Sequence, residues 1–151
     1  MAGDDVSGDD PSETEPEVEI DLREPPIRIV LADDSDDLRT MLRTWLEIDG
    51  RFVVTGEVSS GEELLELVGE HQPDEVVLDL AMPVVDGFAA IAQIRRASPG
   101  TKILVLSAFA SPTVRRKAFS LGADAVLVKG VSLEEVEATL VRLREHAAHP
   151  S

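Results

Sequence analysis

Residues 75–83 read EVVLDLAMP, a short apolar run that stops at an aspartate and a turn. The run Glu75–Leu78 is rich in valine and is bounded by polar residues, which is typical of a buried strand. Amphipathic stretches with helical spacing separate it from similar runs on either side, so the sequence predicts five βα units. The four other predicted strands are Ile27–Ala32, Phe52–Val58, Ile103–Leu106 and Ala125–Val128.

Start and stop signals support the helices between these strands. Ser60 and Ser132 each precede a glutamate by three residues, the spacing of a capping box. Ser111 and Pro112 predict the start of the fourth helix, whose apolar spacing is clearest from about Val114 to Leu121, and Gly122 predicts its end. Right-handed crossovers then give a doubly wound α/β fold, a three-layer (βα)5 sandwich. Strand order 2-1-3-4-5 fits its parallel sheet best.

Composition excludes several classes of function. The chain has no cysteine, so disulfides and thiolate metal sites are excluded. No apolar run approaches the roughly 20 residues needed to span a bilayer, and the N-terminus lacks the features of a signal peptide. These observations predict a cytoplasmic protein without membrane contact. The net charge of −16 argues against direct nucleic-acid binding by this chain.

The charge is unevenly distributed along the chain. Residues 1–26 hold ten acids and one base, a net of −9, with few apolar side chains. This composition predicts a disordered acidic leader, followed by one domain at 27–146 and a short tail at 147–151. The leader is either a solubilising tail or an arm that contacts a basic partner or the surface of the domain itself.

Polar residues follow four of the predicted strands at the points where they end. Asp33 and Asp34 follow the first strand, Asp79 the third, Ser107 ends the fourth and Lys129 follows the fifth. In an open α/β sheet these strand ends share one edge, so we expect the side chains to converge there. Three adjacent carboxylates repel one another unless cations neutralise them, and Lys129 together with Mg²⁺ would do so. The set suits phosphoryl transfer, with Asp79 as nucleophile, Asp33 and Asp34 at the metal, and Ser107 and Lys129 on the phosphoryl oxygens.

These residues resemble the receiver domain of two-component response regulators over about 27–146. The resemblance implies a flavodoxin-like fold and phosphorylation of Asp79 by a sensor histidine kinase or a phosphotransfer protein. It also implies a Mg²⁺ requirement, with a metal contact from the backbone carbonyl of Ala81, and no enzymatic activity beyond self-catalysed phosphorylation and dephosphorylation. The pieces that match are Asp33–Asp34, Leu78–Asp79, Met82–Pro83, Asp86–Gly87, Ser107 and Lys129.

No output domain follows the receiver region before Ser151, so we expect a stand-alone receiver that signals by contact with a downstream protein. The predicted helix with Arg115, Arg116 and Lys117 is a candidate surface for that contact. Two alternatives stay open: a receiver fragment of a DNA-binding transcriptional regulator, and a phosphorylation-independent interaction module. A phosphatase of the haloacid-dehalogenase type is disfavoured, because it needs an acid two residues after the nucleophile, where this chain has Ala81.

Two positions depart from the common receiver pattern. Gly130 follows the lysine where many receivers have proline, which predicts a looser loop. Val126 lies three residues before the lysine, where many receivers have tyrosine or phenylalanine. A valine cannot make the rotation that an aromatic ring makes there, whereas the chemistry at Asp79 does not involve it.

Overall fold

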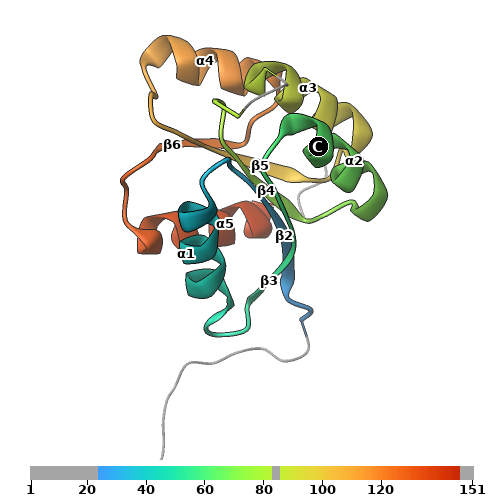
Figure 1. Cartoon of the computed structure of the whole chain (residues 1–151), viewed down its shortest axis with the longest axis vertical. Coiled ribbons are helices and arrows are strands. Elements are labelled where there is room, and N and C mark those ends of the chain that lie inside the picture. Colours follow the sequence, from blue (N-terminus) through green and yellow to red (C-terminus); the bar gives the residue numbers. More distant parts are fainter. Residues whose placement is uncertain (1–23, 83–85, 147–151) are drawn as a thin grey trace, which may run out of the picture.

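The computed structural model describes residues 24–82 and 86–146, in which strands and helices alternate (Figure 1). The predicted leader falls mostly outside these residues, as does the predicted tail. The strands are β2 (Ile27–Ala32), β3 (Phe52–Val58), β4 (Glu75–Leu78), β5 (Lys102–Ser107) and β6 (Ala125–Val128). The helices are α1 (Asp36–Glu47), α2 (Gly61–His71), α3 (Gly87–Ala97), α4 (Pro112–Leu121) and α5 (Leu133–His146).

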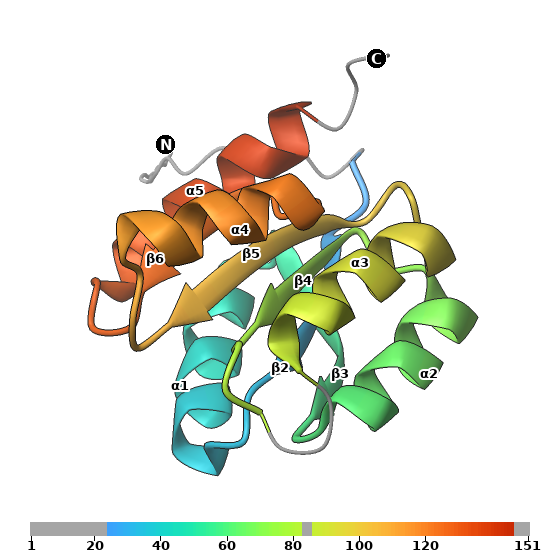
Figure 2. The ribbon, with the colours of Figure 1, turned by 90° about the horizontal axis from the view of Figure 1, so that it is seen from above.

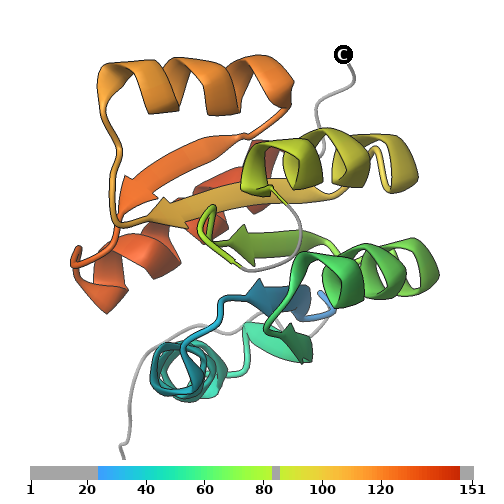
Figure 3. The ribbon, with the colours of Figure 1, turned by 45° about the horizontal axis from the view of Figure 1, so that its top comes forward.

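All five strands lie in one parallel sheet, in the order β3-β2-β4-β5-β6. Numbered from β2, this is the predicted order 2-1-3-4-5, so the predicted flavodoxin-like fold class is confirmed. Helices α1 and α5 cover one face of the sheet, and α2, α3 and α4 cover the other (Figures 2 and 3). The chain order of strands reverses between β2 and β4, and ligands of such sheets bind outside the carboxyl ends of the strands at this point.

Two apolar clusters fill the space between the sheet and its two helical layers. Successive side chains of a strand point to opposite faces, so β2 contributes to both clusters. Ile29 and Leu31 pack with α1 and α5, whereas Val30 and Ala32 pack with α2 and α3. The buried side chains are mainly aliphatic, as the low aromatic content predicts. The strands are therefore held from both sides, and their ends are fixed in position.

The predicted helix signals are confirmed, with small differences in extent. The hydroxyls of Ser60, Ser111 and Ser132 each accept a hydrogen bond from the amide three residues on, at 3.4, 3.2 and 3.1 Å. The return bond of a capping box is shifted, because Glu63 accepts from the amide of Ser59 at 3.5 Å. Helix α4 starts at Pro112, two residues before the apolar spacing becomes clear, and β5 is one residue longer at each end than predicted.

Within the described part of the chain, none of the helices combines the length and the apolarity that crossing a membrane requires.

Candidate functional site

The carboxyl edge of the sheet places its polar residues through backbone hydrogen bonds. Beyond the last residue of β4, the amide of Asp79 donates to the carbonyl of Ala32 at 2.9 Å. Beyond β6, the amide of Lys129 donates to the carbonyl of Ser107 at 2.7 Å. Pairing with the neighbouring strand therefore fixes the main chain of Asp79 and Lys129, and both project from the same edge of the sheet.

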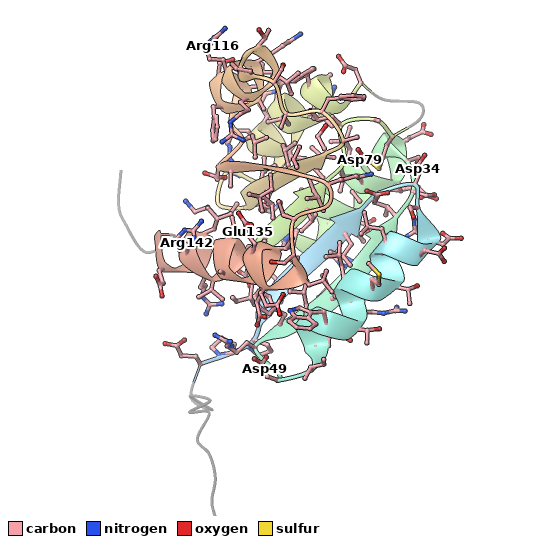
Figure 4. The ribbon with its side chains drawn as sticks, turned by 90° about the vertical axis from the view of Figure 1, so that its left-hand side faces the viewer. Asp34, Asp49, Asp79, Arg116, Glu135 and Arg142 are labelled. Atoms are coloured by element: carbon pink, nitrogen blue, oxygen red, sulfur yellow. The ribbon has the colours of Figure 1, made fainter. Side chains whose placement is uncertain are left out.

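Asp33, Asp34 and Asp79 form an acidic cluster at this edge. One carboxylate oxygen from each residue lies within 4.8 Å of the others. Asp33 and Asp79 are buried, with 4% and 2% of their surface exposed, whereas Asp34 is exposed. Asp34 and Asp79 lie at the same end of the sheet in Figure 4. The cluster is thus reachable from solvent on one side and enclosed on the other.

The two buried aspartates share one hydrogen-bonding pattern. Oδ1 of each accepts from the amide two residues on, at 2.8 Å from Ser35 and 3.0 Å from Ala81. Oδ2 of each faces Lys129, whose Nζ lies 2.9 Å from Asp33 and 3.2 Å from Asp79. One ammonium group therefore bridges two buried carboxylates, and the donors hold both side chains in a single orientation.

The charges around Lys129 keep it protonated. Burial by itself lowers the pKa of the ammonium, but hydrogen bonds and coulombic attraction to Asp33 and Asp79 outweigh burial and raise the pKa above its ordinary value. Three carboxylates and one ammonium leave a net charge of −2 if all are ionised. This charge matches that of one divalent cation.

The chemistry of the donor set fits Mg²⁺. Mg²⁺ prefers oxygen ligands and usually takes one or two protein carboxylates while keeping several waters. The acidic cluster supplies only oxygen donors, and the exposure of Asp34 leaves room for water and for a phosphate oxygen. The backbone amide of Ala81 donates a hydrogen bond to Asp79. The predicted metal contact from Ala81 would use the backbone carbonyl of the same residue.

Ser107 lies beside the cluster and is not hydrogen-bonded to it among the described residues. It is 6% exposed and pairs in register with Val128, the residue before Lys129. Its hydroxyl accepts a hydrogen bond from the amide of Phe109 at 3.3 Å. The structure thus brings together Asp33, Asp34, Asp79 and Lys129, with Ser107 at the end of the adjacent strand.

Arg39 is a residue of this region that the sequence reasoning missed. Its guanidinium donates to the backbone carbonyl of Asp33 and to the carboxylate of Asp36. It also donates to Glu57 on β3, at 3.3 Å, so it ties the loop after β2 to α1 and to the edge strand. The three-residue spacing from Asp36 hints at a helical ion pair. Only the fold brings Glu57 to this arginine.

The two departures from the receiver pattern have clear structural consequences. Gly130 has a φ of +105°, which proline cannot adopt because its ring holds φ near −65°. The backbone after Lys129 therefore takes a path that requires glycine. Val126 is 3% exposed and packs in the core, and its carbonyl accepts a hydrogen bond from Arg115 at 3.0 Å.

Comparisons with known proteins agree on one family. The model of the response regulator receiver domain family matches residues 29–141. The chain is 38% identical over 119 residues to "Response regulator MprA" of Mycobacterium sp. (strain KMS), covering 79% of this chain and 50% of the relative. It is also 38% identical over 123 residues to "Probable transcriptional regulator ycf27" of Guillardia theta, covering 82% of this chain and 47% of the relative.

A solved structure supports the same relationship. The signal receiver domain of NarL from Mycobacterium tuberculosis superposes with a TM-score of 0.77 at 30% identity, covering 81% of this chain and 98% of that one. The chain spans about half the length of the two curated relatives, so the prediction of a stand-alone protein stays untested.

Proposed function

Because the chain belongs to the response regulator receiver domain family, we propose that Asp79 accepts a phosphoryl group from a histidine kinase or a phosphotransfer protein. Receiver domains are signalling modules of two-component systems rather than enzymes in the ordinary sense, and Mg²⁺ binding is typical of them. In this proposal the chain signals through contact with another protein. The proposal includes a cytoplasmic location, which is typical of the family.

The observation that carries the proposal is the setting of the Asp79 carboxylate. It is almost fully buried, held by the amide of Ala81 on one oxygen and by Lys129 on the other. Phosphoryl transfer requires a positioned nucleophile and positive charge at the transferring oxygens, and little else from the protein. Asp79 meets the first requirement, and Lys129 meets part of the second.

The proposed step transfers phosphorus from nitrogen to oxygen. A carboxylate oxygen of Asp79 bonds to phosphorus while the P–N bond to a phosphohistidine of the donor breaks. The imidazole keeps the electron pair of that bond and takes up a proton from water, so that it leaves as a neutral group. Lys129 would then bind a phosphoryl oxygen in place of part of its contact with Asp79, and Ser107 would hold another oxygen through its hydroxyl.

Mg²⁺ in this site would offset the negative charge that gathers as the phosphoryl group approaches the acidic cluster. Asp33, Asp34 and Asp79 are the carboxylates that would hold it, with the Ala81 carbonyl as a further ligand. Arg39 would keep the loop with Asp33 and Asp34 in the orientation that binding requires.

A groove beside Lys129 gives the phosphodonor a place to bind. It has a volume of about 270 Å³ and lies between α1 and the segment that leads from β6 into α5. Met41 in its lining is 52% exposed, and apolar side chains dominate the rest. A donor whose apolar surface covered this groove would bring its phosphohistidine close to Asp79.

For the output we keep two candidates. The first is a protein partner that contacts α4 through Arg115, Arg116 and Lys117, which are exposed. The second is a role as the receiver part of a DNA-binding regulator, which the names of the relatives and the half-length coverage favour. An antibody against this domain distinguishes them by the size of the native polypeptide, because a regulator with a DNA-binding domain would be about twice as long.

The first test is intact-mass spectrometry after incubation with acetyl phosphate. We expect a mass increase of one phosphoryl group with Mg²⁺, little with EDTA, and none in Asp79→Asn, because that change removes the nucleophile and keeps the shape of the side chain. An adduct that persists in Asp79→Asn would contradict the assignment. No adduct in the folded parent with Mg²⁺ would favour the phosphorylation-independent interaction module.

The second test measures Mg²⁺ affinity by titration calorimetry. Asp34→Asn removes the exposed carboxylate of the acidic cluster, and we expect Mg²⁺ binding to weaken by about tenfold or more. Asp37→Asn is the matched control, because it makes the same charge change three residues away on an exposed site. Equal weakening in both variants would mean that Mg²⁺ affinity depends only on net charge, and would count against a Mg²⁺ site at the acidic cluster.

A further inference from the structure

Two neighbouring helices, α3 and α4, carry basic residues and no acid. Helix α4 reads PTVRRKAFSL and α3 reads GFAAIAQIRRA, whereas α1, α2 and α5 each contain at least three acids. The two helices contact each other on the same face of the sheet (Figure 2). In a chain with a net charge of −16, this side of the molecule is locally positive.

The basic residues of α4 are open to solvent. Arg115, Arg116 and Lys117 are exposed, and Arg116 projects outward from α4 in Figure 4. Arg115 uses one nitrogen for the carbonyl of Val126, and Lys117 lies 4.5 Å from the centre of the Phe88 ring. Among residues 24–82 and 86–146, no carboxylate forms an ion pair with these three cations.

An exposed aromatic ring lies one helical turn after Arg115. Phe119 is 44% exposed on the same helix, and only Ala118 of α4 is buried. We call Arg115, Arg116, Lys117 and Phe119 the basic surface of α4. A segment that combines carboxylates with apolar side chains would match both features of this surface.

The leader of the chain has this combination. Residues 1–23 contain nine acids and one base. Its last part, Glu17–Leu22, reads EVEIDL, in which acidic and apolar residues alternate. In an extended chain such alternation puts carboxylates on one side and apolar side chains on the other. Only one side of such a segment can face a given surface, and the carboxylate side suits the exposed cations of α4.

The attachment point allows the leader to reach α4. The leader joins the domain just before β2, at the edge of the sheet where strands begin. Helix α4 ends at Leu121, and the chain then runs to the start of β6 at the same edge. Three strand spacings separate β2 from β6, about 14 Å along the sheet, and α4 lies one layer further out, over the face of the sheet (Figure 2). A random-coil chain of 23 residues would have an average end-to-end distance of about 25–30 Å, so carboxylates toward the N-terminal part of the leader can reach α4.

We infer that residues 1–23 of the acidic leader bind the basic surface of α4 within the same chain. Single exposed ion pairs are weak, but a tethered segment is present at an effective concentration near the millimolar range, so several weak pairs suffice. The contact depends on long-range charge attraction between exposed groups and is therefore weakened by salt. It does not depend on the phosphorylation proposed above, so the two can fail separately.

Cysteine crosslinking in the full-length chain tests this contact, because the chain has no cysteine of its own. One variant pairs Ser12→Cys in the leader with Ser120→Cys near the end of α4. The control pairs Ser12→Cys with Gly69→Cys near the end of α2, where an added Cβ meets no atom within 4 Å. Since α2 contacts β2, the strand that the leader precedes, a passive tail would reach Gly69 at least as easily.

We expect the Ser120 pair to form the intramolecular disulfide several-fold faster than the Gly69 pair in 20 mM NaCl. The preference should vanish in 1 M NaCl. It should also fall in Arg116→Glu but not in Arg142→Glu, which makes the same charge change on an exposed arginine of α5. Equal rates for the two pairs, a preference that salt or Arg116→Glu leaves unchanged, or disulfides only between two chains would each overturn the inference.

Discussion

Buried carboxylates occur in two opposite settings at the two edges of the sheet. Asp33 and Asp79, at the carboxyl edge, each accept from a backbone amide and from Lys129. Glu75 begins β4 at the other edge, is 1% exposed, and has no hydrogen-bond partner for either oxygen in the described structure. Burial, followed by repulsion from Asp74, raises the pKa of Glu75 to about 8. The Glu75 side chain is therefore a neutral carboxylic acid at pH 7.

The raised pKa of Glu75 makes stability depend on pH. Between its ordinary value of 4.5 and about 8, the folded state holds a proton that the unfolded state has lost. The free energy of unfolding therefore falls as pH rises through this range, by up to about 1.4 kcal/mol per pH unit from this group. Below pH 4.5 its contribution is fully present, and above pH 8 no further loss comes from it.

Glu75→Gln tests this dependence, because glutamine stays neutral at every pH. We expect the stability of the variant relative to the parent to rise by roughly 2 kcal/mol from pH 5.5 to 7.5. Urea unfolding followed by the fluorescence of Trp45, the only tryptophan, measures it. Glu70→Gln on the exposed side of α2 is the control. A constant difference between Glu75→Gln and parent across this range would show that Glu75 does not titrate as described.

At the scale of elements, the junction between the Asp79 loop and α3 depends on Gly87. A Cβ on this first residue of α3 would lie 2.5 Å from the Cα and the carbonyl oxygen of Leu80. These are backbone atoms, so a side-chain rotation cannot relieve the overlap. The close approach holds the start of α3 against the turn that follows Asp79.

Gly87→Ala should therefore destabilise the domain by roughly 1–3 kcal/mol. Gly69→Ala in α2 is the matched control, because its added methyl group meets nothing within 4 Å and alanine favours a helix. We expect this control to stabilise by about 0.5–1 kcal/mol. The urea unfolding midpoints of the two variants measure both effects. A Gly87→Ala variant as stable as the parent would mean that α3 can move away from Leu80 at little cost in free energy.

At the scale of the whole molecule, charge is sorted by region. The acidic cluster occupies the carboxyl edge, the basic surface of α4 lies on one helical layer, and the first 26 residues carry more than half of the negative excess. Net charge of this size keeps a chain soluble but opposes compaction. Contact between oppositely charged regions would reduce that opposition, which gives the proposed leader contact a physical basis.

The order of elements followed from the sequence because each signal was local. Short valine- and leucine-rich runs marked the strands, and serine caps marked helix starts, within one or two residues of their final bounds. The placement of Asp33, Asp79, Ser107 and Lys129 at strand ends was equally local. Convergence of the strand ends at one edge follows from parallel strands alone. The roles of these four residues in phosphoryl transfer remain predictions.

Other features were decided only by the tertiary structure, because they join residues far apart in the chain. The bridge from Lys129 to both buried aspartates, the link from Arg39 to Glu57, and the burial of Glu75 without a partner depend on strand order and side-chain direction. Strand order was predicted from the sequence, but a local pattern does not give the directions in which side chains of different strands point or the distances between them. The sequence by itself therefore determined the (βα)5 architecture and the residues that reach the site, whereas folding decided which atoms meet there and how their charges are shared.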